Sequence, residues 1–119
     1  MIDEEPVVVA LSRRQLDAYN RADLEGFCAC YHPDIEVLDA EGKVSQRGME
    51  AFRARYATMF ATFRDVRAAV DQRVVLSPHV VERERWSRVH RETGEETSGV
   101  VLVRYTEVDG LLRYAEFLR

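Results

Sequence analysis

Hydrophobic residues recur at the three- and four-residue spacing of a helix in three places along the first half of the chain. The first set follows Pro6 and comprises Val8, Leu11, Leu16 and Tyr19. The second follows Asp23, a residue type that caps helices well, and comprises Leu24, Phe27, Cys28 and Tyr31. The third and strongest comprises Met49, Phe52, Tyr56, Met59, Phe60 and Phe63. This spacing predicts three amphipathic helices, the second of which ends at His32-Pro33.

Strand patterns occupy the rest of the chain. Ile35 and Val37 alternate with polar residues and predict a strand, which a loop joins to the third helix at Gly48. Beyond that helix the chain is rich in Val and Tyr and is broken by turn signals such as Asp109-Gly110. Four strands are predicted there, at about 66–76, 80–90, 97–108 and 111–118. This order predicts an α+β domain in which a curved antiparallel sheet wraps around the helices and leaves an internal pocket for a small molecule.

Composition and charge narrow the expected partners. With 119 residues, 46% of them hydrophobic and 32% charged, the chain reads as one globular domain covering 1–119. A formal net charge of -4 argues against a nucleic-acid partner. The longest apolar stretch near the N-terminus, Val7 to Leu11, is too short for a membrane span and lacks the basic flank of a signal peptide, so we expect a cytoplasmic protein with no membrane partner. Cys28 and Cys30 are expected to be free thiols, and no glycine-rich loop or ligand cluster indicates a metal, nucleotide or flavin cofactor.

The order of elements and three segments resemble a known superfamily. The segments AYNRADLEGF, YHPDIEVLDAEG and GMEAFRARYATMF resemble the nuclear transport factor two-like, or SnoaL-like, superfamily, and the resemblance covers essentially the whole chain. It implies a cone-shaped α+β fold with an internal pocket. Known members include ketosteroid isomerases, polyketide cyclases, dehydratases and epoxide hydrolases, so the resemblance fixes no single reaction.

The resemblance to bacterial ketosteroid isomerases, a branch of this superfamily, points to individual residues. Asp39 takes the place of the general base, and Tyr31 and Tyr56 take the places of two tyrosines in the network beneath the oxyanion hole. The oxyanion-hole tyrosine itself falls on Gln15, and the protonated aspartate of a late strand falls on an apolar residue. Because losing one donor of this kind costs about a hundredfold or more in rate, steroid isomerisation as in that family is not expected.

Two hypotheses about Asp39 are open: it is a general base at the mouth of the pocket, or it is a turn residue. It shares its face of the strand with two apolar residues, so it would lie at the mouth of the pocket, where desolvation raises the pKa of a carboxyl toward that of a general base. Tyr31, Tyr56 and the weaker donor Gln15 would then bind a substrate carbonyl or hydroxyl. Alternatively, Asp39 and the glycine of the sequence DAEG form a type I turn, and both tyrosines are core residues.

The strand at 80–90 offers a second carboxylate. Alternation places Glu84 on the same face as Trp86, which indicates an inward-facing side, and Glu84 would then pair with Arg104 or Arg113 of a neighbouring strand. The alternative is a solvated or dimer-facing strand held by cross-strand charge pairs. The predicted site comprises Gln15, Tyr19, Phe27, Tyr31, Asp39, Tyr56, Phe60, Glu84 and Trp86.

Three functions fit these observations. The first is a proton-transfer enzyme of the isomerase, cyclase or dehydratase type, with Asp39 as its base. The second is a non-catalytic protein that binds a small apolar or carbonyl-containing molecule. The third is an interaction module whose uncovered sheet face, where Arg83, Arg85 and Val89 lie, pairs with a second copy, as a homodimer, or with another protein.

Overall fold

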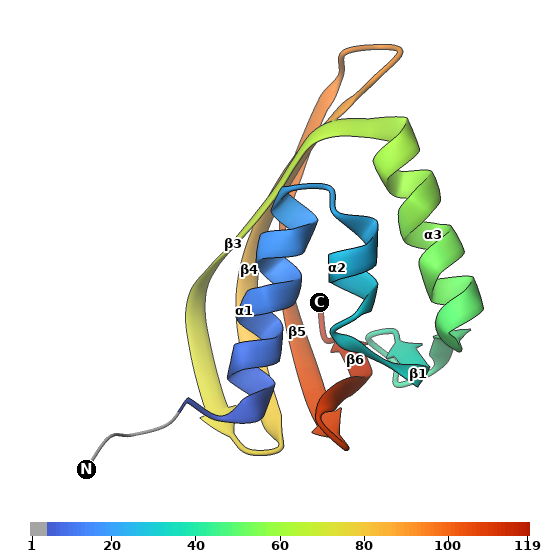
Figure 1. Ribbon diagram of the computed structural model, residues 1–119. Helices are drawn as coiled ribbons and strands as arrows, with labels where there is room; N and C mark the ends of the chain where they lie inside the picture. The colour runs from blue at the N-terminus through green and yellow to red at the C-terminus, as the bar shows by residue number, and fades with distance from the viewer. Residues whose placement is uncertain (1–4) are drawn as a thin grey trace.

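Two of the helices begin and end close to the positions that the hydrophobic spacing predicts. In the computed structural model, which describes residues 5–119, α1 spans Val7–Asn20 and α3 spans Met49–Thr62 (Figure 1). Each turns an apolar stripe toward the sheet, because burial of that stripe stabilises a helix more than its intrinsic propensity does.

The short helix α2 ends earlier than predicted. It spans Leu24–Cys28 and is capped by Asp23, whose carboxylate accepts a hydrogen bond from the N–H of Gly26 at 3.0 Å. The predicted continuation to Tyr31 is wrong, because Tyr31 already begins the first strand and is paired with Leu112. Pairing with a strand far along the chain therefore overrides the local helical spacing.

Six strands form one curved sheet in the order β2-β1-β6-β5-β4-β3. Its strands are β1 (Tyr31–Leu38), β2 (Val44–Arg47), β3 (Phe63–Leu76), β4 (His79–His90), β5 (Glu96–Val108) and β6 (Leu111–Phe117). Neighbours are antiparallel except β1 and β6, which run parallel. The edge strand β2 was predicted as loop, since its four largely exposed residues carry no apolar face.

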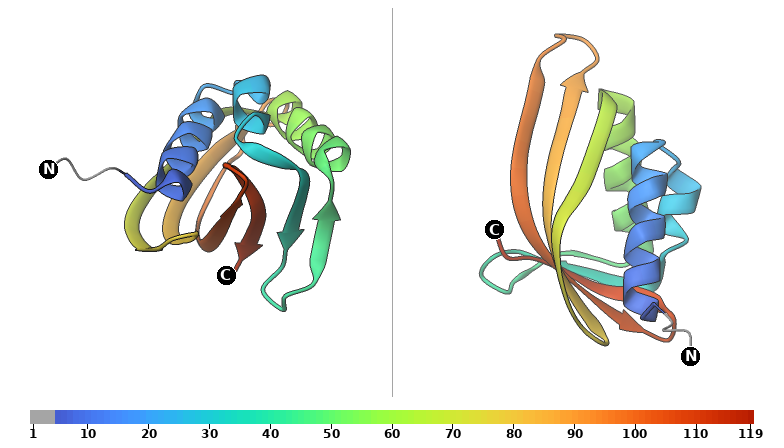
Figure 2. Two further views of the ribbon diagram at one scale, coloured as in Figure 1. Left: turned by 60° about the horizontal axis from the view of Figure 1, so that its bottom comes forward. Right: turned by 90° about the vertical axis from the view of Figure 1, so that its left-hand side faces the viewer.

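The three helices cover one face of this sheet, which curves around them without closing into a barrel (Figure 2). The four strands of the second half match the predicted ones closely, and the α+β prediction is confirmed. At the turn between β5 and β6, Asp109 and Gly110 have φ of 55° and 80°, as the tight turn predicted from their sequence requires.

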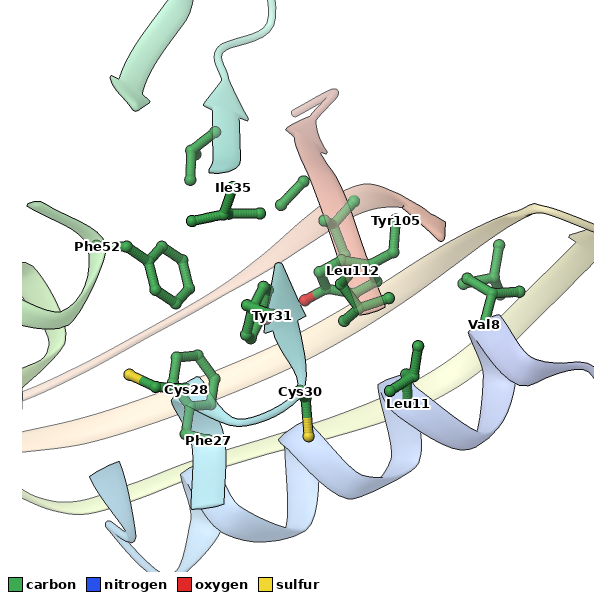
Figure 3. Packing of buried hydrophobic residues seen from close by; sticks show 14 of the residues in the cluster. Val8, Leu11, Phe27, Cys28, Cys30, Tyr31, Ile35, Phe52, Tyr105 and Leu112 are labelled. Carbon is green, nitrogen blue, oxygen red and sulfur yellow. The ribbon is translucent and has the colours of Figure 1, made fainter. Parts of the chain in front are cut away.

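The core lies between the helices and the concave face of the sheet. Its largest fully buried apolar side chains are Phe27, Phe52, Ile35 and Leu112, which come from α2, α3, β1 and β6 (Figure 3). These four elements pack together beside a cavity, which lies between the helices and strands β3 to β6. None of the helices found in residues 5–119 has the length and apolar character needed to cross a membrane.

Candidate functional site

A cavity of about 210 Å³ lies between the helices and the inner face of the sheet. It is lined by Gln15, Leu16, Tyr19, Phe27, Tyr31, Arg55, Tyr56, Met59, Ala68, Glu84, Trp86, Arg88, Val101, Tyr105 and Phe117. Pockets for drug-sized ligands usually measure about 300 to 1,000 Å³. The cavity is therefore sized for a small organic molecule.

Helical spacing and strand alternation place these side chains on the faces that surround the cavity. Gln15 and Tyr19 stand four residues apart on α1, so they lie on one face of the helix. Glu84, Trp86 and Arg88 alternate along β4 and line the cavity from the same side of the sheet. The inward direction of Glu84 and Trp86 agrees with the alternation read from the sequence.

Trp86 lies against a glycine of the neighbouring strand. Gly99 on β5 is directly opposite Trp86 in the antiparallel register. A Cβ atom at Gly99 would come within 2.8 Å of the Trp86 Cζ2 atom, too close for a real contact. The absence of a side chain at Gly99 therefore lets the indole lie on the sheet and sets the space left in the cavity.

Three tyrosines form a packed aromatic wall around Phe27. The ring centroid of Phe27 lies 4.5 Å from that of Tyr56, 5.1 Å from that of Tyr31 and 5.9 Å from that of Tyr19. Burial raises the pKa of Tyr56 to about 12 and that of Tyr31 well above its ordinary value, so both phenols stay protonated at neutral pH. The Tyr31 hydroxyl donates a hydrogen bond to the Gln15 Oε1 at 3.0 Å.

Among residues 5–119, Glu84 is the only carboxylate that lines the cavity, and its carboxyl forms no hydrogen bond or ion pair with any of them. The predicted pairing with Arg104 or Arg113 is wrong. Arg104 binds Glu116 at 2.9 Å, and Arg113 lies 3.5 Å from Glu36. Each arginine is thus engaged by a carboxylate on β6 or β1, and neither neutralises Glu84.

The environment of Glu84 favours its neutral form. Burial raises its pKa from 4.5 to about 7, and the negative charge of Glu82 acts more weakly in the same direction. Glu82 is fully buried, and its two carboxylate oxygens accept hydrogen bonds from Ser12 Oγ at 2.6 Å and Arg73 Nε at 2.7 Å. The two glutamates therefore differ in role, since Glu82 is held in a structural ion pair and Glu84 titrates near neutrality.

Asp39 is held in a turn and does not line the cavity. Its Oδ1 atom accepts hydrogen bonds from the backbone N–H groups of Lys43 at 3.0 Å and Glu41 at 2.9 Å. These bonds lower the pKa of Asp39, which is the opposite of what a general base needs. A register shift in β1 between Val37 and Leu38 breaks the alternation that predicted an inward direction. The structure thus corrects the expectation that Asp39 lies at the pocket mouth and supports the alternative of a turn residue.

The other predicted site residues gather around the cavity with one exception. Those that line it are Gln15, Tyr19, Phe27, Tyr31, Tyr56, Glu84 and Trp86. Phe60 lies outside the lining and packs against Tyr19 and Phe27, with ring centroids 5.7 Å and 6.5 Å away. Phe60 therefore supports the aromatic wall and does not itself line the cavity.

Several lining residues were not singled out from the sequence. Arg88 stands two residues beyond Trp86, and Tyr105 stands two residues beyond the fully buried Val103. Because side chains two residues apart on a strand share a face, strand alternation could have predicted that both point inward. Arg55 had no such signal, because it neighbours Tyr56 on α3 and is otherwise an exposed helix residue.

The described residues offer little to hold a metal ion. Within 5–119, no three His, Cys, Asp or Glu side chains are grouped closely enough for that purpose. Cys28 and Cys30 are free and buried, as predicted. Burial raises the pKa of both thiols, which keeps them in the less reactive protonated form.

The fold and the sequence pattern agree with a family model. The model described as the SnoaL-like domain matches residues 12–115. The chain belongs to the SnoaL-like family. The SnoaL-like match includes every residue that lines the cavity except Phe117. No curated protein matches the chain.

Solved structures share this SnoaL-like fold at low sequence identity. An uncharacterised cystatin-fold protein from Novosphingobium aromaticivorans is similar at a TM-score of 0.86 and 19% identity, over 98% of this chain and 100% of that one. The Δ5-3-ketosteroid isomerase from Mycobacterium sp. is similar at 0.83 and 21% identity, over 95% and 92%. A computationally designed 17-OHP binder is similar at 0.84 and 14% identity, over 95% and 92%. These likenesses show the fold alone, and the nuclear transport factor two-like resemblance noted from the sequence is confirmed by them together with the family match.

Proposed function

We propose that this protein binds a small, largely apolar molecule in its cavity and that Glu84 exchanges a proton with a carbonyl or hydroxyl compound bound there. The observation that carries the proposal is a single carboxyl without a protein partner among residues 5–119, facing an aromatic cavity. A pKa of about 7 makes both its protonated and its ionised forms available at neutral pH, which suits a group that takes and returns a proton.

In this proton transfer Glu84 is the base and Tyr56 stabilises the enolate. The Glu84 carboxylate takes a proton from a carbon next to the carbonyl of the ligand, and the electron pair of that C–H bond moves to form an enolate. Tyr56, protonated because its pKa is about 12, donates a hydrogen bond to the enolate oxygen. Protonated Glu84 then returns the proton to the same or another carbon, which exchanges hydrogen or isomerises the ligand.

Similarity in fold supports both catalysis and binding as possible uses of the cavity. One similar structure is a ketosteroid isomerase, and another is a designed 17-OHP binder. Pure ligand binding is favoured by one observation: the Tyr31 hydroxyl donates its hydrogen to Gln15, so it is not free to donate to a ligand. The second candidate function is therefore a non-catalytic binding protein that uses the same cavity.

Hydrogen exchange separates the two functions. The probe is 4-phenyl-2-butanone, a neutral ketone that forms an enolate, incubated in heavy water and followed by proton NMR. The wild-type protein should accelerate exchange next to the carbonyl, and Glu84→Gln should reduce that acceleration by about a hundredfold or more. The matched carboxylate control is Asp39→Asn, which should retain it. Binding of the ketone without any accelerated exchange would leave only the binding function, whereas loss of exchange in the control alone would make Asp39 the base.

The outer face of the sheet supports the proposal of a homodimer. Val100 and Leu102 on β5 are 45% and 40% exposed on the face away from the helices. Their register partners on β4 are Arg85 and Arg83, both of which bind Asp71. A second copy would cover this apolar strip. Sedimentation equilibrium should give twice the chain mass, and Leu102→Glu should give the monomer mass.

A further inference from the structure

Two arginines, Arg55 and Arg88, line the cavity without a carboxylate to neutralise them. Most other arginines of the described chain pair with an acid, as Arg85 does with Asp71 at 2.7 Å. Within residues 5–119, Arg55 and Arg88 have no acidic side chain within ion-pair distance. These two side chains therefore bring uncompensated positive charge to a largely apolar and aromatic cavity.

The guanidinium of Arg88 is held in place by aromatic rings. Its central carbon lies 4.0 Å from the ring centroid of Phe63 and 5.2 Å from that of Trp86. Stacking of this kind fixes the plane of the group and leaves its N–H edges to bind a ligand. A guanidinium prepared in this way is suited to two parallel hydrogen bonds with a carboxylate.

Two buried polar atoms, one in this guanidinium and one on the neighbouring strand, lack a hydrogen-bond partner in the described chain. They are Nε of Arg88 and Oγ1 of Thr97. Arg88 on β4 and Thr97 on β5 are directly opposite in the antiparallel register, so their side chains lie on the same face. Leaving such atoms unsatisfied is costly, and one acceptor oxygen placed between them would receive a hydrogen bond from each.

The acidic and basic ends of the cavity are well separated. Glu84 and Arg88 are four residues apart on one strand, which puts their Cα atoms about 13 Å apart, with Trp86 between them. Tyr19 lies within electrostatic reach of both groups. Burial and the charge of Glu84 raise the pKa of Tyr19, whereas the charge of Arg88 lowers it. An anionic group at Arg88 would therefore lie far from the Glu84 carboxyl and would not repel it strongly.

We infer that the ligand of this cavity is a small organic acid, whose carboxylate binds Arg88 and Thr97 and whose apolar body extends over Trp86 toward Glu84. Arg55, exposed on α3 at the edge of the cavity, adds a second positive charge that attracts the acid. This inference rests on the proposed binding function and names the class of molecule that it serves.

A pair of probes of equal shape tests the inference. 3-Phenylpropionate and 3-phenylpropionamide differ in charge and hardly in size, and their dissociation constants can be measured by isothermal titration calorimetry at neutral pH. The wild-type protein should bind the acid at least about tenfold more tightly than the amide, since hydrogen bonds to a charged group are the stronger kind. Arg88→Gln should remove this preference and leave amide binding unchanged.

Matched variants separate the specific contact from general charge. Arg85→Gln removes the same charge from the same strand on the opposite face, and it should keep the preference for the acid. Arg55→Gln, on an exposed helix position, should weaken acid binding by a smaller factor than Arg88→Gln and keeps the test available if the latter variant does not fold. Equal affinity for acid and amide in the wild-type protein, with both bound, would overturn the inference while leaving the binding function intact. Failure of both probes and of 4-phenyl-2-butanone to bind would overturn both.

Discussion

Replacing Glu84 by glutamine should stabilise the protein, and the gain should depend on pH. The pKa of this carboxyl is about 7 in the folded chain and 4.5 when it is exposed. Between these values the folded protein keeps a proton that the unfolded chain releases, so the stability of the wild type falls as pH rises and becomes constant above pH of about 7. Each pH unit in this interval costs about 1.4 kcal/mol, so the whole interval costs at most about 3 to 4 kcal/mol. Glutamine has the shape of the protonated acid and no charge, so Glu84→Gln avoids this cost.

Urea denaturation followed by the fluorescence of Trp86, the one tryptophan of the chain, measures this difference. At about pH 4, wild type and Glu84→Gln should have nearly equal free energies of unfolding, and at about pH 8 the variant should be more stable by about 2 to 3 kcal/mol. The matched control is Glu92→Gln, at an exposed position between β4 and β5, which should show no such change with pH. A difference between Glu84→Gln and wild type that stays the same at both pH values would refute the conclusion that Glu84 is buried without a partner.

Three further substitutions test other parts of the structure. Arg73→Met leaves the buried carboxylate of Glu82 without its cation, and urea denaturation should record a loss of about 3 to 5 kcal/mol; a loss below about 1 kcal/mol would mean that this ion pair is not needed. Gly99→Ala introduces a Cβ atom that would lie 2.8 Å from Trp86, so the indole should shift into the cavity. This shift should change the fluorescence emission spectrum of Trp86 and weaken the binding of 3-phenylpropionate. An unchanged spectrum and affinity would contradict this packing. Asp39→Asn should leave the affinity for 3-phenylpropionate unchanged, and weaker binding of this acid would show that Asp39 contacts the ligand. The same substitution should lower stability only at pH values above the pKa of Asp39, because the lowered pKa reflects hydrogen bonds to the ionised carboxylate.

Local patterns in the sequence determined most of the fold. The apolar stripes of α1 and α3 and the alternation within β3 to β6 are set by residues within one or two turns of each other, so their periods can be read directly. The end of α2 and the edge strand β2 could not be read in this way. Tyr31 leaves the helix because its backbone pairs with Leu112, a residue far along the chain, and no local pattern records that pairing.

The candidate site shows the same contrast between what local sequence patterns determine and what contacts between distant segments decide. By itself, the sequence determined that Glu84 and Trp86 share a face of β4, and that Gln15 and Tyr19 share a face of α1, because side-chain direction follows from backbone periodicity. Only the tertiary structure decided that Glu84 has no partner while Glu82 has two, since this depends on which arginines other strands bring near. A pKa is set by burial and by charges within a few ångströms, and those neighbours come from segments that are distant in the sequence.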